Sequence, residues 1–366
     1  MVKPKRSLAS FDYSAAFDTI SKETVQQRLE DIGATENFKA WMASYMDGGR
    51  QRARWNGAIS SFLERLHGVA QGSKAGPLVF IFVTMVNFAL LSSAVGYADD
   101  TSNANSQVAG LNSDSEVLVG LSKELGLVLN PSKTQCIIYG NVSDSGNQIT
   151  VDGVTIAPSE KICLLGFTLD NKLQPQLYLK ELADGVLYRK HVVGRLSAHL
   201  PPHVLKMFTR ATVLGKMRTY LHLALKARLS ENDPLTCWGK KLQVIVNDVS
   251  RVVVRKRRSD HVRVEDLLKK AGLESVNSMV CSNSAMLAWK ASKPESPLHD
   301  LFLDMLPHGC TRSRAAGKIE VPAPNTKNIA LWNMAVTWNA IPDLRVAKSE
   351  GRARKIVRQF VKSLPI

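Results

Sequence analysis

Two adjacent aspartates, Asp99 and Asp100, are the residues of this chain with the clearest potential for chemistry. Aspartate disfavours strands and favours turns, so residues 96–101 predict a hairpin with both carboxylates at its tip. Like charges at this spacing repel each other, and a divalent cation would relieve the repulsion. An isolated Asp-Asp pair is more often a solvated turn, so the interpretation depends on the neighbouring motifs.

Four further motifs accompany the aspartate pair in a fixed order along the chain. They are SFDYSAAFDTI at residues 10–20, GVAQGSKAGPL at 68–78, LGLVLNPSKT at 125–134 and LLGFTLD at 164–170. With GYADDT at residues 96–101, this set resembles the palm motifs of reverse transcriptases, in particular those of jockey-type non-LTR retrotransposons. The resemblance covers residues 8–170 and is weaker beyond them, at residues 311–313 and 338–342.

The resemblance implies an α+β fold: a polymerase palm, which is an antiparallel sheet with packed helices, then a mostly helical thumb and a carboxy-terminal extension. We expect the palm at residues 1–170 and a basic thumb or connection at 171–292. The extension, with a linker and a basic last helix, would cover residues 293–366. The implied activity is RNA-directed DNA synthesis, with an RNA template, a DNA primer and deoxynucleoside triphosphates as partners.

The same resemblance assigns the catalytic carboxylates. Asp12 and Asp99 would bridge two metal ions and Asp100 would support them, because nucleotidyl transfer onto a primer 3′-hydroxyl uses two ions roughly 3.5–4 Å apart. Mg²⁺ prefers such hard oxygen ligands, and Mn²⁺ is a possible substitute. Lys133 resembles the lysine that protonates the departing pyrophosphate, although a solvated loop lysine is an equal alternative. Asp18 is interpreted as a capping residue at the strand-to-helix turn.

Further positions resemble the substrate contacts of the family. The nucleotide-binding set is Tyr13, Phe17, Gln71 and Gly72, and the primer or template set includes Tyr97, Leu165 and Gly166. Phe17 matches the aromatic residue that crowds the sugar 2′ position, although a phenylalanine there is also an ordinary core residue. Ala70 stands where the family has proline, and Lys74 and Ala75 stand where apolar residues are typical.

The charge distribution separates the two halves of the chain. The formal net charge is +16. Residues 1–170 hold 14 Lys and Arg against 17 Asp and Glu, a net charge of −3, and residues 171–366 hold 34 against 15, a net charge of +19. An acidic half suits a cation site and a basic half suits nucleic acid.

The densest basic run lies at residues 250–258 within the basic half. We assign its cationic residues Arg251, Arg255, Lys256, Arg257 and Arg258 to primer or template binding through phosphates. A solvated face and a nuclear-import signal are the alternatives.

Composition narrows the class of protein further. No run of 18 apolar residues is present, so we expect neither a membrane span nor a membrane partner. The five cysteines are scattered, which predicts a reducing compartment. The resemblance to a retroelement polymerase implies an intracellular protein of cytoplasm and nucleus. Cys281, His299, His308 and Cys310 do not have the spacing of a known metal site.

Apolar periodicity predicts the elements that must position these residues. We expect strands at residues 8–13, 94–103 (as a hairpin), 135–139, 149–151 and 162–169, and helices at 21–33, 37–45, 114–125 and after Pro77. Beyond residue 170 the pattern becomes helical, at 177–196, 204–229, 242–254, 330–341 and 351–363.

Only eleven residues precede Asp12, where the family has fingers that hold the triphosphate. We therefore expect little polymerase activity from this chain by itself, because positioning is a large part of such catalysis. The rival hypothesis is a catalytically silent remnant that binds RNA or DNA through residues 171–366. A two-metal nuclease is a third, and it leaves the glycine-rich loop and the 125–134 motif unexplained.

Overall fold

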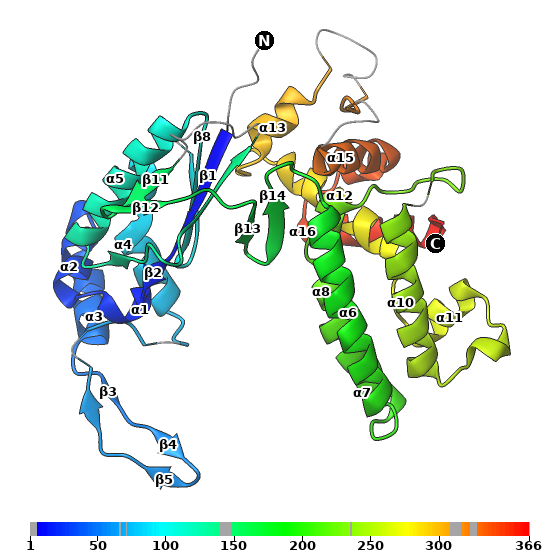
Figure 1. Ribbon diagram of the computed structural model, residues 1–366, viewed down its shortest axis with the longest axis horizontal. Coiled ribbons are helices and arrows are strands. Elements are labelled where there is room, and N and C mark those ends of the chain that lie inside the picture. Colours follow the sequence, from blue (N-terminus) through cyan, green and yellow to red (C-terminus); the bar gives the residue numbers. More distant parts are fainter. Residues whose placement is uncertain are drawn as a thin grey trace. The chain divides into compact units, whose positions relative to one another are not determined.

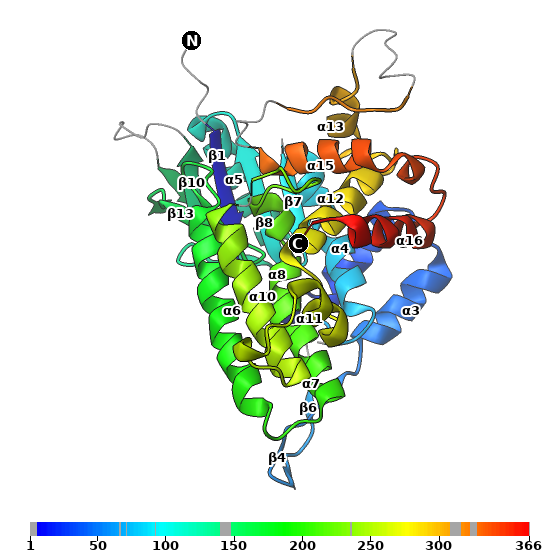
Figure 2. The same cartoon turned by 90° about the vertical axis from the view of Figure 1, so that its right-hand side faces the viewer.

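The computed structural model describes residues 6–65, 67–70, 72–91, 93–139, 148–234, 236–307, 316–322 and 328–365. The chain divides into two compact units, Met1–Leu173 and Gln174–Ile366. Figures 1 and 2 show the ribbon of both units. Unit 1 contains sheet and helices, and unit 2 is helical.

Unit 1 is built on a four-stranded antiparallel sheet with the strand order β10–β1–β8–β7. The strands are β1 (Arg6–Phe11), β7 (Ala94–Tyr97), β8 (Asp100–Asn105) and β10 (Gln135–Tyr139). Side chains alternate between the two faces of a strand, and in β1 every second residue, Ser7, Ala9 and Phe11, is buried. The sheet therefore has one covered face and one open face.

Helices cover the buried face of this sheet. They are α1 (Ala16–Thr19), α2 (Lys22–Asp31), α3 (Glu36–Met46), α4 (Gly76–Leu90) and α5 (Val108–Glu124). Helix α5 contacts β1 and β8, and α4 contacts β7; Figure 1 shows them together on one side of β1 and β8. The Ser21 side chain caps α2 by accepting from Thr24 N, and Pro77 occupies the first turn of α4, where its missing N–H costs nothing.

Short two-stranded ribbons complete unit 1. They are β2 (Tyr13–Ser14) with β9 (Val128–Leu129), β3 (Arg50–Gln51) with β6 (Leu63–Glu64), β4 (Arg54–Trp55) with β5 (Ala58–Ile59), β11 (Ile149–Val151) with β12 (Val154–Ile156), and β13 (Lys161–Leu164) with β14 (Phe167–Asp170). Asn56 and Gly57 have φ of 46° and 85° at the tip of β4–β5, as a type I′ turn requires.

Unit 2 is helical in its described residues. Its α-helices are α6 (Gln176–Leu196), α7 (Pro202–Thr209), α8 (Gly215–Arg218), α9 (Leu221–Ala224), α10 (Cys237–Val254), α11 (Val264–Ala271), α12 (Val276–Ala291), α13 (His299–Asp304), α15 (Ile329–Ala340) and α16 (Glu350–Phe360). Helices α6, α7 and α11 each contact α10, and α15 and α16 contact α12. One buried apolar cluster joins α12, α13, α15 and α16.

The Trp338-Asn339 dipeptide of the weaker carboxy-terminal resemblance has a structural role. Trp338 Nε1 donates to Gly317 O at 2.9 Å. Asn339 accepts from Ile319 N at 3.0 Å and donates to Ile319 O at 2.8 Å. These bonds hold the segment 316–322 against α15. Residues 311–313, His308 and Cys310 lie outside the described residues.

The structure departs from the sequence prediction at residues 204–229. One long helix was expected, but α7 passes into a π-helical segment, Arg210–Leu214, and then into α8 and α9. Thr212 Oγ1 donates back to Phe208 O at 2.8 Å, a contact that competes with regular helical bonding. Helix α5 also begins at Val108, six residues before the predicted start. The predicted α+β class is confirmed.

Candidate functional site

Asp12 lies in the break between β1 and β2, at the end of a central strand of the sheet. Its carbonyl oxygen accepts from Asn130 N at 2.7 Å, and Tyr13 pairs with Leu129 one residue further on. The motif at residues 125–134 is therefore tied by the backbone to the strand that delivers Asp12. Asn130 was part of a motif in the sequence, but its role in holding Asp12 needed the fold.

Asp99 lies in the tight turn between β7 and β8, and Asp100 is the first residue of β8. Tyr97 pairs with Asp100, so Ala98 and Asp99 are the two residues of the hairpin loop. Ala98 has φ of 53°, the left-handed conformation that two-residue hairpin loops require. The predicted hairpin is confirmed. Pairing of Phe11 with Thr101 brings its tip to the end of β1 next to Asp12.

Electrostatics show that the three carboxylates are neighbours. Burial raises the pKa of Asp100, and the negative charges of Asp99 and Asp12 raise the pKa further. A nearby like charge disfavours ionisation of a carboxyl, which is why the charges of Asp99 and Asp12 raise this pKa. The fold thus brings together two segments that are 87 residues apart in the sequence, Asp12 and Asp99.

Lys133 is the cation nearest to this site in the described part of unit 1. Its Nζ lies 3.3 Å from Asp12 Oδ2, and that oxygen is enclosed without a hydrogen-bond donor. The lysine side chain is 64% exposed, which leaves it free to turn toward a bound substrate. The structure therefore places the sequence-predicted Lys133 beside Asp12.

The donor set fits hard divalent cations by its chemistry. Among the described residues, no group of three or more His, Cys, Asp or Glu side chains is gathered into a ready metal cage. Mg²⁺ sites in phosphoryl-transfer enzymes use one or two carboxylates and complete the shell with water and substrate phosphates, so such a cage is not required. The enclosed oxygen of Asp12 and the mutual repulsion at Asp100 are the features that a cation would satisfy.

The glycine-rich loop docks tightly on the segment after Asp12. Gly68 N donates to Ile20 O and Val69 N donates to Phe17 O, both at 2.8 Å. A Cβ at Gly68 would lie 2.7 Å from Asp18 Cα and 2.8 Å from Phe17 O. Only glycine allows this approach, a role of Gly68 that the sequence motif did not reveal. Gly72 has φ of 81° with open space beside it, and Gln71 lies outside the described residues.

The aromatic residues of the site have different environments. Phe17 stacks on Phe80 of α4 with ring centroids 4.9 Å apart, so it is held against the core while remaining partly exposed. Tyr13 is 5% exposed and its hydroxyl lies 3.5 Å from Ser122 Oγ, which makes its side chain a core side chain. This differs from the expected contact with nucleotide, and only the backbone of Tyr13 remains available. Tyr97 is 67% exposed beside Asp100.

Leu165 and Gly166 form the turn of the β13–β14 hairpin. Their φ values are 49° and 85°, so a leucine occupies a left-handed position that bulky residues avoid. A pocket of about 330 Å³ lies between this hairpin and the open face of the sheet. Its lining includes Leu165, Tyr97 and Asp100. The hairpin and the carboxylate site therefore border the same space.

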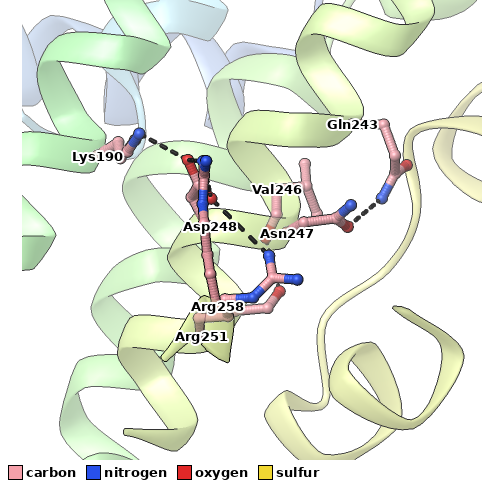
Figure 3. Close-up of polar contacts among 8 residues, drawn as sticks. Lys190, Gln243, Val246, Asn247, Asp248, Arg251 and Arg258 are labelled. Carbon is pink, nitrogen blue, oxygen red and sulfur yellow. Dashed lines mark hydrogen bonds and ion pairs between the residues drawn. The ribbon is translucent and has the colours of Figure 1, made fainter. Parts of the chain in front are cut away.

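In unit 2 the basic run is partly neutralised by one buried carboxylate (Figure 3). Asp248 of α10 accepts from Lys190 Nζ of α6 at 2.8 Å and from Arg258 at 2.9 Å and 3.0 Å, and Arg251 lies 3.8 Å away. Lys256 lies 3.7 Å from Asp260. Arg251, Lys256 and Arg258 thus have carboxylate partners within the chain. The sequence alone did not identify Asp248 as the partner of Arg251 and Arg258 or Asp260 as the partner of Lys256.

The Asp248 network is expected to matter for stability. Burial alone raises the pKa of Asp248, but hydrogen bonds from Lys190 and Arg258 outweigh it and the pKa is lowered. Its contribution is therefore present above the unfolded-state pKa and is lost as pH falls through the lowered folded value. We expect Asp248→Asn to reduce the free energy of unfolding by about 2 kcal/mol at pH 7, since it removes the buried carboxylate that pairs with Lys190 and Arg258.

Urea unfolding at pH 7 and in acid would measure the effect of Asp248→Asn, which should shrink as the pH falls. Glu350→Gln is the matched control, because Glu350 pairs with Arg354 on an exposed helix surface. Its cost should be clearly smaller than that of Asp248→Asn, because exposed ion pairs contribute little to stability. Equal effects of the two substitutions would mean that Asp248 is solvated like a surface carboxylate.

Comparison with known families gives a match over most of unit 1. Residues 2–169 match the family model described as reverse transcriptase (RNA-dependent DNA polymerase). This match covers just under half of the chain, and the segment is similar to that family. A search of curated proteins found no match.

Similar solved structures are telomerases. The telomerase of Candida tropicalis in complex with a fragment of telomeric RNA is 12% identical, with a TM-score of 0.36, over 82% of this chain and 49% of that one. The apo telomerase of the same organism is 10% identical with a TM-score of 0.38, covering 81% and 52%. The telomerase of Candida albicans is 13% identical with a TM-score of 0.27, covering 76% and 47%. The chain thus spans about half the length of these proteins.

Within the described ranges, none of the helices combines the length and the apolar character needed to cross a bilayer.

Proposed function

We propose that this chain is the polymerase part of a jockey-type non-LTR retroelement and transfers deoxynucleotides from their triphosphates onto a primer 3′-hydroxyl along an RNA template. The observation that carries the proposal is the placement of three aspartates: pairing of Phe11 with Thr101 sets the turn that holds Asp99 and Asp100 beside Asp12 at the end of β1. The reverse transcriptase match of residues 2–169 and the retroelement-like order of the five motifs support it.

Asp12, Asp99 and Asp100 would hold the divalent cations that reverse transcriptases use. When bound, such ions supply positive charge to the phosphate oxygens of the reacting groups. Asp12 Oδ2 is already enclosed, and the Lys133 ammonium group lies within ion-pair distance of it. Lys133, whose side chain is 64% exposed, would be the group that donates a proton to the departing pyrophosphate.

The loop at Gly68–Val69 would form one wall of the nucleotide site. Its two backbone bonds to residues 17 and 20 fix the loop beside Phe17, which is braced by Phe80. A rigid aromatic wall at this place can exclude a 2′-hydroxyl and so favour deoxynucleotides. The exposed Tyr97 and the Leu165–Gly166 turn, which border the pocket on the open face, would support the primer end.

Primer extension tests this function directly. The purified chain would be given an RNA template with an annealed DNA primer, deoxynucleotides and Mg²⁺, in parallel with a DNA template. Extension that requires the RNA template and all four deoxynucleotides supports the proposal. Shortening of either strand without extension would support a two-metal nuclease, and binding with neither reaction would support a silent nucleic-acid binder.

The ionised Asp100 side chain is expected to lower the free energy of unfolding at neutral pH, because its pKa is raised in the folded chain. A carboxyl whose folded pKa is raised stabilises the fold below its unfolded pKa and loses that contribution as pH rises through the folded value. Asp100→Asn is therefore expected to raise the free energy of unfolding at pH 7 by a few tenths to about 1 kcal/mol, a small effect because the group is largely solvated. Chemical denaturation at pH 7 and pH 4 would show the gain disappearing in acid. A less stable variant at pH 7 would mean that Asp100 is held by favourable contacts.

A further inference from the structure

A small basic pocket lies in unit 2 between α7 and the carboxy-terminal ends of α10 and α11. Its volume is about 260 Å³, and its charged lining consists of Lys206, Arg255 and Lys270, with His203 beside them. No carboxylate lines it. The three cations come from sequence positions far apart, so their convergence is a property of the fold.

These three cations differ from Arg251, Lys256 and Arg258 of the basic run in having no ion pair with a carboxylate among the described residues. Arg251, Lys256 and Arg258 are within 4 Å of Asp248 or Asp260. Lys206, Arg255 and Lys270 make no ion pair with a carboxylate of the described ranges. Three like charges around one small space repel each other, and an anion relieves that repulsion.

Helix dipoles account for only part of this charge. The carboxy-terminal ends of α10 and α11 each carry roughly half a negative charge, about one in total against three formal positive charges. The end of α11 already has a partner, because Arg210 Nε donates to Gly272 O at 3.1 Å. The amino-terminal end of α7, at His203, adds positive potential. A surplus of positive charge remains.

Arg255 adopts a backbone conformation that favours glycine, at the carboxy-terminal end of α10. Arg255 ends α10 with φ of 54°, and Lys256 N donates to Arg251 O at 2.9 Å in the manner of a Schellman motif. Glycine is the usual residue at this left-handed position, and an arginine there is strained. Strain retained at one residue is typical of positions that serve a ligand.

We propose that this pocket binds one phosphate group of a nucleic-acid backbone, shared among Lys206, Arg255 and Lys270. The inference rests on the proposed function for the identity of the polyanion. A phosphodiester offers several acceptor oxygens to converging cations and carries no sequence information. The pocket thereby fixes the position of unit 2 on the nucleic acid and not the choice of sequence.

The salt dependence of binding tests the pocket in the full chain. The probe is a labelled DNA duplex, whose affinity is measured between 50 and about 300 mM NaCl. Neutralising one phosphate contributes about 0.9 to the slope of log affinity against log salt. Because one phosphate is shared, the triple variant with Lys206→Ala, Lys270→Ala and Arg255→Gly should flatten the slope by about 0.9, and Lys206→Ala or Lys270→Ala alone should flatten it by a measurable part of that amount.

Two variants separate binding from folding. Arg255→Gly relieves the strained backbone, so its Tm should equal or exceed that of the unchanged chain while its affinity falls several-fold. Lys269→Ala removes an equal charge from α11 at the residue before Lys270. Lys269 does not line the pocket, so this variant should leave the slope unchanged. Inorganic phosphate should compete with the duplex for the unchanged chain and not for the triple variant.

Some outcomes would overturn the pocket. A slope that falls by about 2.7 in the triple variant, three times the value of one contact, would mean three independent surface contacts. An unchanged slope would mean that the cations only serve the helix ends. Binding of inorganic phosphate that the triple variant loses, with duplex affinity and slope the same in both chains, would assign the pocket to free phosphate. Each result is independent of primer extension, whose failure would concern the carboxylate site alone.

Discussion

Replacing Asp99 by asparagine is expected to lower whatever rate of primer extension the chain shows on an RNA template by about a hundred-fold to a thousand-fold. Removing one preorganised group that stabilises developing charge costs about this much in enzymes. The side chain keeps its size, and Asp99 lies in a two-residue turn whose backbone does not need the charge. The loss would therefore arise from the weakened hold on cations and not from unfolding. Single-turnover extension with Mg²⁺ measures it.

Asp18→Asn is the matched control for Asp99→Asn. Asp18 belongs to the same motif as Asp12, but it is exposed and lies in the short helix α1. Its variant should retain extension within a few-fold of the unchanged chain. If both variants lose activity equally, the assignment of the carboxylates is wrong. If Asp99→Asn extends primers normally, the aspartate pair is a solvated turn.

Mg²⁺ binding supplies a second readout for the same pair of variants. A ligand that binds only the folded chain raises its stability by mass action. Mg²⁺ should therefore raise the Tm of the unchanged chain and of Asp18→Asn more than that of Asp99→Asn. Equal shifts in all three would place the cation elsewhere.

The hairpin of the candidate carboxylate site could be predicted from the sequence because local rules govern it. An Asp-Asp pair after a short apolar strand favours a hairpin, and that hairpin is present at β7–β8. The meeting of Asp12 with this hairpin came from the resemblance and not from periodicity. Pairing of β1 with β8 is a non-local contact that the spacing of apolar residues does not encode.

The basic run shows what sequence reasoning missed. A row of arginines and lysines in the sequence predicts one cationic surface. In the fold Asp248 pairs with Arg258 and with Lys190, so part of that charge is neutralised within the chain. Partners at positions 190, 248 and 258 lie on different elements, so no window of the sequence contains the network. The same holds for Lys206 and Lys270, which no motif singled out. Pairing of charges depends on packing, and packing is decided by the whole helical unit.

Gly68→Ala is expected to be the most damaging single change in the glycine-rich loop. The added Cβ would meet only backbone atoms: Asp18 Cα at 2.7 Å, Phe17 O at 2.8 Å and Asp18 O at 2.9 Å. Backbone cannot rotate away as a side chain can, and φ of 80° is itself unfavourable for alanine. We expect a loss of about 2–4 kcal/mol in the free energy of unfolding, or displacement of the loop with loss of its bonds to Phe17 and Ile20.

Gly72→Ala separates close approach from backbone strain. Gly72 has nearly the same φ, 81°, but a Cβ there would meet nothing within 4 Å. Its cost should be limited to the left-handed penalty of about 1–2 kcal/mol. Urea unfolding compares the two variants, and hydrogen exchange of the Gly68 and Val69 amides, which donate to Ile20 and Phe17, reports whether the loop stays docked. If Gly68→Ala unfolds like Gly72→Ala and keeps both amides protected, the loop yields to the added methyl group. The docked loop would then not be what holds Phe17 in place as the wall of a nucleotide site.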